Sequence, residues 1–63
     1  MTTQEALLAM KIGCKIRADW MKQDLYYYIK GDYIYCSDNN SRIFTPVNKF
    51  TTIFDESHNW YIV

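Results

Sequence analysis

The sequence predicts an α+β domain in which one N-terminal helix packs on a small antiparallel sheet of about five strands. Three features indicate this fold: a helix-start motif, several short segments with alternating apolar and polar residues, and tight-turn residues between those segments. Residues 1–63 contain no linker or repeat, so we expect a single domain. A chain of this size buries only about 60% of its unfolded surface, and we therefore expect self-association to reinforce it.

A helix is expected over residues 3–12. Thr2 fits the N-cap position and Glu5 stands three residues later, which is the spacing of a capping box. Residues 6–11 are good helix formers, and Gly13 suits the left-handed conformation that ends many helices.

The strands follow from period-two alternation and from two turns. Gly31 and Asp32 predict a two-residue hairpin turn, and residues 38–41 predict a second tight turn. Residues 47–57 are expected to form a short helix or a loop. The expected strands are residues 14–20, 25–30, 33–37, 42–45 and 59–63.

The turns also fix which residues stand opposite one another, and thereby the two faces of the sheet. They are expected to pair Tyr28 with Tyr35, Tyr35 with Phe44, and Ala18 with Tyr27. The expected core face carries Cys14, Ile16, Ala18, Trp20, Leu25, Tyr27, Ile29, Ile34, Cys36 and Ile43. The expected outer face carries Lys15, Arg17, Asp19, Tyr26, Tyr28, Lys30, Tyr33, Tyr35, Arg42 and Phe44.

Aromatic residues and cations dominate this outer face, which indicates an interaction surface rather than a merely solvated one. Two interpretations remain open. The face is either an interface between protomers or a platform on which tyrosines stack against bases while cations meet phosphates. Both interpretations hold if a ligand binds where protomers meet.

Charge and composition narrow the function. Seven basic and seven acidic residues balance, which argues against nucleic acid as a partner because its binding rests on many phosphate contacts. No segment approaches the roughly 20 apolar residues of a membrane helix, and no secretion signal is evident. We therefore expect a protein of the cytosol that does not engage membranes, with both cysteines reduced.

We expect no catalysis, cofactor or metal. Asp55, Glu56 and His58 are close in sequence, but nothing positions a nucleophile or a second base beside them, so a solvated loop is expected. Cys14 and Cys36 lack the close spacing of zinc ligands and are expected to pack as small core residues.

Three motifs in order resemble the anti-Thoeris proteins of the second type, a family of small phage proteins. The motifs are a helix with residues 4–7, a basic strand that ends in tryptophan at residues 15–20, and a tryptophan-containing closing strand at residues 59–62. The chain departs from the family at residues 54–58, where an acidic, leucine-containing segment is usual, and at Asn59, where the family has an acidic residue.

The resemblance implies a homo-oligomer, a tetramer in the family, that sequesters a cyclic ADP-ribose derivative or a cyclic dinucleotide without cleaving it. Such a protein would act as a phage counter-defence sponge in the host cytosol. The expected ligand-binding residues are Arg17, Trp20, Tyr26, Tyr28, Asn59 and Trp60.

Three alternatives stay open. Both tryptophans are equally well explained as core anchors. A protein–protein inhibitor would dock its tyrosine-rich face on a host enzyme. A single-stranded nucleic-acid binder would use the same aromatic and basic residues, although the neutral net charge disfavours it.

Overall fold

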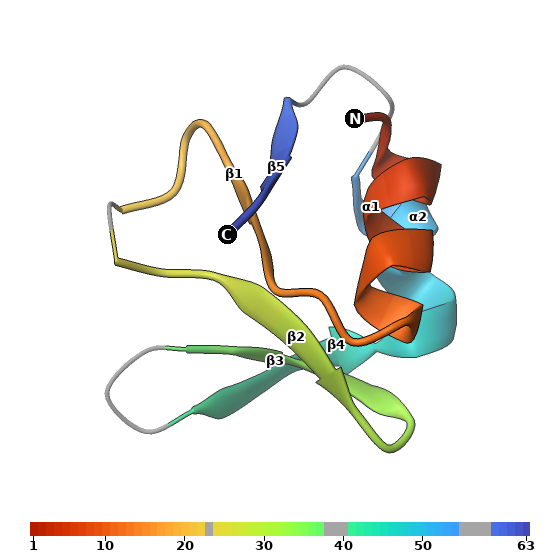
Figure 1. Cartoon of the computed structure of the whole chain (residues 1–63). Coiled ribbons are helices and arrows are strands. Elements are labelled where there is room, and N and C mark those ends of the chain that lie inside the picture. The colour runs from red at the N-terminus through yellow and green to blue at the C-terminus, as the bar shows by residue number, and fades with distance from the viewer. Residues whose placement is uncertain (23, 38–40, 55–58) are drawn as a thin grey trace.

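The computed structural model, which describes residues 1–22, 24–37, 41–54 and 59–63, has helices on one side of a five-stranded antiparallel sheet (Figure 1). The strands lie in the order β4-β3-β2-β1-β5, so that the last strand flanks β1. This confirms the predicted α+β fold. The elements are α1 (Thr3–Lys11), β1 (Ile16–Ala18), β2 (Tyr27–Lys30), β3 (Tyr33–Cys36), β4 (Arg42–Pro46), the 3₁₀ helix η1 (Val47–Lys49), α2 (Phe50–Ile53) and β5 (Trp60–Ile62).

The capping box at the start of α1 is present as predicted. The Thr2 hydroxyl accepts a hydrogen bond from the Glu5 backbone N–H at 3.1 Å, and the Glu5 carboxylate accepts one from the Thr2 N–H at 2.8 Å. The backbone hydrogen bond from Thr2 holds the pKa of Glu5 below its usual value. At the other end, Gly13 has a φ of 100°, a conformation that residues with a Cβ rarely adopt.

The hairpin between β2 and β3 has the predicted register. Tyr28 pairs with Tyr35 and Lys30 pairs with Tyr33, while Gly31 takes a φ of 64° in the turn. Tyr27 and Ile34 therefore point to the core, where they are 4% and 0% exposed.

The register between β1 and β2 differs from the prediction by two residues. Tyr27 pairs with Ile16 instead of Ala18. The strand stops at Ala18 because the chain turns there: the Met21 N–H donates to the Ala18 carbonyl, and the Ala18 N–H donates to the Met21 Sδ, both at 3.1 Å. A shift of two residues leaves the faces unchanged, and Ile16 and Ala18 are buried as predicted.

The predicted register between β3 and β4 is wrong by one residue. This difference moves side chains of β4 to the opposite face of the sheet from the one predicted. Tyr35 pairs with Ile43, and Arg42 pairs with Cys36, because five residues rather than four connect the strands. A bulge then shifts the register between Ile34 and Tyr35. Ile43 is consequently 55% exposed, whereas Phe44 turns to the core side and stacks on Tyr27 at 4.7 Å.

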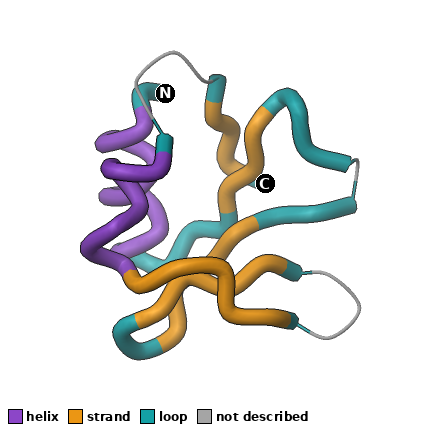
Figure 2. The backbone as a smooth tube through the Cα atoms, turned by 180° about the vertical axis from the view of Figure 1, so that it is seen from behind, coloured by secondary structure: helices purple, strands orange, loops and turns teal. Residues whose placement is uncertain are grey.

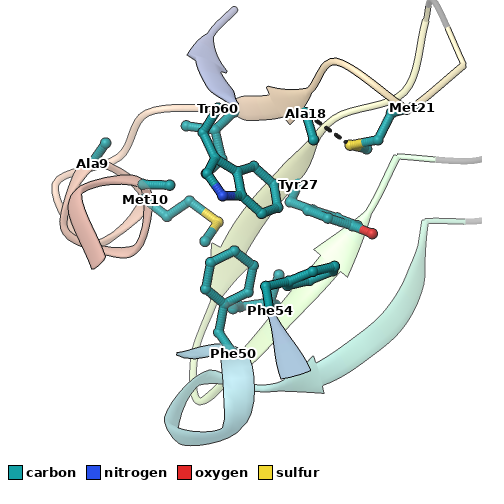
Figure 3. Packing of buried hydrophobic residues seen from close by; sticks show 11 residues of the cluster. Ala9, Met10, Ala18, Met21, Tyr27, Phe50, Phe54 and Trp60 are labelled. Carbon is teal, nitrogen blue, oxygen red and sulfur yellow. Dashed lines mark hydrogen bonds between the residues drawn. The ribbon is translucent and has the colours of Figure 1, made fainter. Parts of the chain in front are cut away.

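The core is centred on aromatic rings from distant parts of the chain (Figure 3). Phe50 and Phe54, at the start of α2 and just after it, each lie 5.2 Å from the Trp60 ring of β5. Met10 of α1 closes the cluster, and the Trp60 indole N–H donates to the Thr3 hydroxyl at 3.0 Å. Residues 47–53 therefore form helix, one of the two predicted outcomes for the segment, and they bring Phe50 into the core.

The Thr3–Trp60 hydrogen bond yields a stability prediction. Replacing Thr3 with valine keeps the side-chain shape but leaves a buried indole N–H without its acceptor, so we expect a loss of about 1–3 kcal/mol in the free energy of unfolding. Urea denaturation measures it. The matched control is Thr3→Ser, which retains the hydroxyl and should lose clearly less; equal losses would contradict a role for the hydrogen bond.

Candidate functional site

One side of the sheet is not covered by helices, because both helices pack on the face that carries Ile16, Tyr27 and Trp60 (Figure 2). Alternation along β2 and β3 turns the intervening residues to the opposite side. We call this surface the tyrosine face; it consists of Lys15, Tyr26, Tyr28, Lys30, Tyr33 and Tyr35.

The rings of the tyrosine face form a contiguous row along β2 and β3, and Lys15, just before β1, lies beside it. The Lys15 Nζ lies 5.1 Å from the centre of the Tyr26 ring, which is the range of a cation–π contact. The Tyr26 and Tyr28 rings are 5.9 Å apart, and Tyr28 stacks on Tyr35 at 5.6 Å with an interplanar angle of 18°. The result is a partly exposed aromatic strip with a cation at one end.

Other side chains extend this strip. Lys30 and Tyr33 form an exposed cross-strand pair beyond Tyr28 and Tyr35. On the far strands, Ile43 pairs with Tyr35, and Tyr61, which is 51% exposed, pairs with Arg17. The tyrosine face is thus bordered by apolar and aromatic groups on both sides.

Arg17 holds the chain segment that follows β1. One of its terminal nitrogens donates to the carbonyls of Met21 and Lys22, at 3.0 and 3.2 Å. Its Nε is buried and has no hydrogen-bond partner. The guanidinium is therefore engaged with backbone, and only part of its donor capacity is left for a ligand.

The six residues predicted to bind ligand do not form one site. Tyr26 and Tyr28 lie side by side on the tyrosine face, and Arg17 lies in the neighbouring strand. Trp20 follows β1 and is 51% exposed; its ring lies 5.8 Å from Phe54, on the core side of the sheet. Trp20 therefore lies on the predicted side of the sheet, but its ring is at the protein surface rather than in the core.

Asn59 and Trp60 differ from each other. The Asn59 side-chain amide donates to the Asp19 carboxylate at 3.2 Å, in an exposed position. Asp19 is the residue before Trp20. Trp60 is 1% exposed and sits within the aromatic core, so its indole is a core anchor, the alternative that the sequence left open. Lys15, Lys30 and Tyr35 were not among the predicted ligand-binding residues, although the alternation pattern placed them on the correct face. Lys15 contacts the Tyr26 ring and Tyr35 stacks on Tyr28, whereas Lys30 pairs with Tyr33.

The described residues show few other chemical groups. Cys14 and Cys36 are half-buried thiols, and no cluster of three potential metal ligands occurs within the described part of the chain. Asp55, Glu56 and His58 lie outside the described residues. No helix in the described segments is both long and apolar enough to cross a membrane.

Comparisons with protein-family models, with curated proteins and with solved structures gave no match to this chain. The resemblance to the anti-Thoeris proteins of the second type therefore stays a prediction.

Removing the Arg17 guanidinium should loosen the segment after β1. In Arg17→Ala, we expect the amides of Met21 and Leu25, which donate to Ala18 and Lys22 carbonyls, to exchange with solvent roughly tenfold faster. Amide hydrogen exchange followed by NMR measures this, with the Ile34 amide of the β2–β3 hairpin as the internal control. Unchanged exchange at both loop amides would show that Arg17 does not hold the segment.

The buried phenol of Tyr27 predicts an alkaline loss of stability. Burial, and to a lesser extent Cys36, raises the pKa of Tyr27 from 10.0 to about 12. The unfolded chain therefore loses this proton first, so the contribution to stability is complete below pH 10 and falls as the pH rises from 10 to 12. Urea denaturation across that range should show that Tyr27 accounts for a loss of about 1–2 kcal/mol in the free energy of unfolding. The Tyr27→Phe variant should lack this loss. An identical alkaline decline in both proteins would contradict the assignment.

Proposed function

We propose that this protein is a non-catalytic binding protein that captures an anionic, base-containing small molecule on the tyrosine face. The single observation that carries the proposal is the row formed by Lys15, Tyr26, Tyr28 and Tyr35, in which a cation adjoins successive aromatic rings on an open sheet surface. A cyclic ADP-ribose derivative or a cyclic dinucleotide combines bases, which stack on aromatic rings, with phosphates, which a cation attracts.

Stacking supplies the larger part of the expected affinity. Each base that stacks on an aromatic side chain contributes about 1–3 kcal/mol, and this contribution requires no specific hydrogen bonds. Tyr28 and Tyr35 already lie nearly parallel, which reduces the conformational entropy that a ligand must remove. Lys15 and Lys30 add positive charge at two points of the strip, where phosphates of a stacked ligand would lie.

The balance of charge favours a small ligand over a nucleic-acid strand. The chain as a whole is neutral, and the tyrosine face itself holds only two cations, Lys15 and Lys30. A polymer needs many phosphate contacts for tight binding, whereas a small cyclic messenger needs only a few.

A sponge works by stoichiometric capture, so tight binding is sufficient and no active site is needed. We propose that the protein acts in this way as a phage counter-defence protein in the host cytosol, and that it self-associates as a dimer or tetramer. The apolar groups that border the tyrosine face, Ile43 and Tyr61, support an interface next to the ligand site.

One observation favours a second function, docking on a host protein. A shallow hollow adjoins the tyrosine face and is lined by Asp32, Tyr33, Pro46, Val47 and Asn48. Tyr33 is 44% exposed there, and aromatic residues beside shallow hollows are typical of protein–protein contacts.

Thermal unfolding in the presence of cyclic ADP-ribose and cyclic dinucleotides tests the proposed function. A ligand at 100 times its dissociation constant should add about 2.7 kcal/mol to the free energy of unfolding. Tyr28→Leu keeps apolar bulk but removes the stacking surface, and Lys15→Ala removes the cation; both should weaken binding at least about fivefold. Lys49→Ala, in η1, is the matched control and should bind normally.

Two results would contradict the proposal. The first is no stabilisation by any cyclic nucleotide together with capture of a single host protein, which would favour the docking function. The second is equal binding by the Tyr28 and Lys49 variants, which would place the ligand elsewhere on the protein.

A further inference from the structure

The outer side of α1 carries two exposed apolar side chains. Leu8 is 61% exposed and Ile12, the residue after the helix, is 82% exposed. The Ile12 N–H still donates to the Leu8 carbonyl, at 3.3 Å, so the two residues stand one helical turn apart on the same side. Ala6, Ala9 and Met10 form the buried side of the helix instead. The Leu8–Ile12 stripe is therefore an apolar surface that the core does not use.

Two charged residues flank Leu8 at equal distances along the helix. Glu5 precedes it by three residues and Lys11 follows it by three, and both are exposed. The backbone hydrogen bond from Thr2 holds the pKa of Glu5 below its usual value, so this carboxylate is ionised near neutral pH. Opposite charges thus occupy mirrored positions about Leu8.

This pattern is self-complementary when two α1 helices pack antiparallel. A two-fold axis beside Leu8 sets each residue before Leu8 level with the residue equally far after it in the second copy. Leu8 then contacts Leu8 of the second copy, and Glu5 lies level with Lys11 of the second copy. At the usual spacing of about 8–10 Å between packed helix axes, side chains of this length reach each other. A parallel pair would instead set like charges level with each other.

We infer that the outer side of α1 is an interface for a second copy of this chain, in which the Leu8–Ile12 stripe packs on its counterpart and Glu5 pairs with Lys11 of the other copy. The inference rests on the self-association in the proposed function and assigns a surface to it. A chain of 63 residues has a small core, so it gains from burying such a stripe. Because α1 packs on the side of the sheet opposite the tyrosine face, both tyrosine faces stay open in this dimer (Figure 2).

Sedimentation equilibrium over a series of protein concentrations tests the interface. We expect a reversible dimer whose dissociation constant rises at least about tenfold in Leu8→Gln, because each copy loses a leucine side chain that the dimer buries. Glutamine is a good helix former and Leu8 is exposed in the single chain, so the variant should fold, which circular dichroism checks. Ile43→Thr is the matched control: it removes exposed apolar surface beside the tyrosine face and should leave the dimer intact.

A charge cycle tests the antiparallel arrangement. Glu5→Gln removes the charge but keeps the capping box, which accepts glutamine at this position, and it should weaken the dimer at least about twofold. Lys11→Glu sets two carboxylates level with each other and should weaken the dimer more. When Lys11→Glu is already present, adding Glu5→Gln should strengthen the dimer, because it removes this repulsion. The effect of Glu5→Gln changes sign only if the two side chains meet.

Three results would overturn the inference. A wild-type chain that stays monomeric at every concentration would also remove self-association from the proposed function, whereas thermal unfolding with cyclic nucleotides decides ligand capture separately. Loss of the dimer in Ile43→Thr, with an intact dimer in Leu8→Gln, would place the interface beside the tyrosine face. Equal effects of Glu5→Gln with and without Lys11→Glu would show that Glu5 and Lys11 do not meet across the dimer.

Discussion

Among the residues that the structure describes, a single backbone pairing, Ile16 with Tyr27, joins the two halves of the sheet. On one side lie β1 and β5, and on the other lie β2, β3 and β4. So short a ladder contributes few hydrogen bonds, and the halves are held together mainly by side chains that bridge them: Tyr27 from one half contacts Trp60 from the other at 6.2 Å, and Phe50 contacts both. Aromatic packing at this joint is therefore what the rest of the fold depends on.

The same joint determines where binding surfaces form. Tyr26, Tyr27 and Tyr28 are consecutive, so strand alternation turns the middle ring inward and its neighbours outward. Because Tyr27 is fixed by the core, the positions of Tyr26 and Tyr28 are fixed as well. A rigid element beneath a binding surface lowers the entropy lost on association, which suits a protein whose proposed task is capture rather than catalysis.

Local signals in the sequence predicted most of the fold. The Thr2–Glu5 capping box and the Gly31–Asp32 turn involve neighbouring residues only, and both are present. The errors arose where register depends on loop length or distant contacts. The five-residue connection before Arg42 moved Phe44 inward, and the turn held by Arg17 and Met21 ended β1 early. For the site, alternation placed Tyr26 and Tyr28 correctly, whereas the burial of Trp60 depends on α2, whose packing no local pattern indicated.

The two outer strands of the sheet are both poorly suited to accept another strand. In β4, a bulge interrupts the ladder and Pro46 lacks an N–H. In β5, only three residues long, the Trp60 carbonyl already accepts a hydrogen bond from the Met1 nitrogen at 3.2 Å. Short, irregular or occupied edges keep a small β-rich chain from polymerising into a continuous sheet. Both edges of this sheet therefore disfavour the addition of a strand from another copy of the chain.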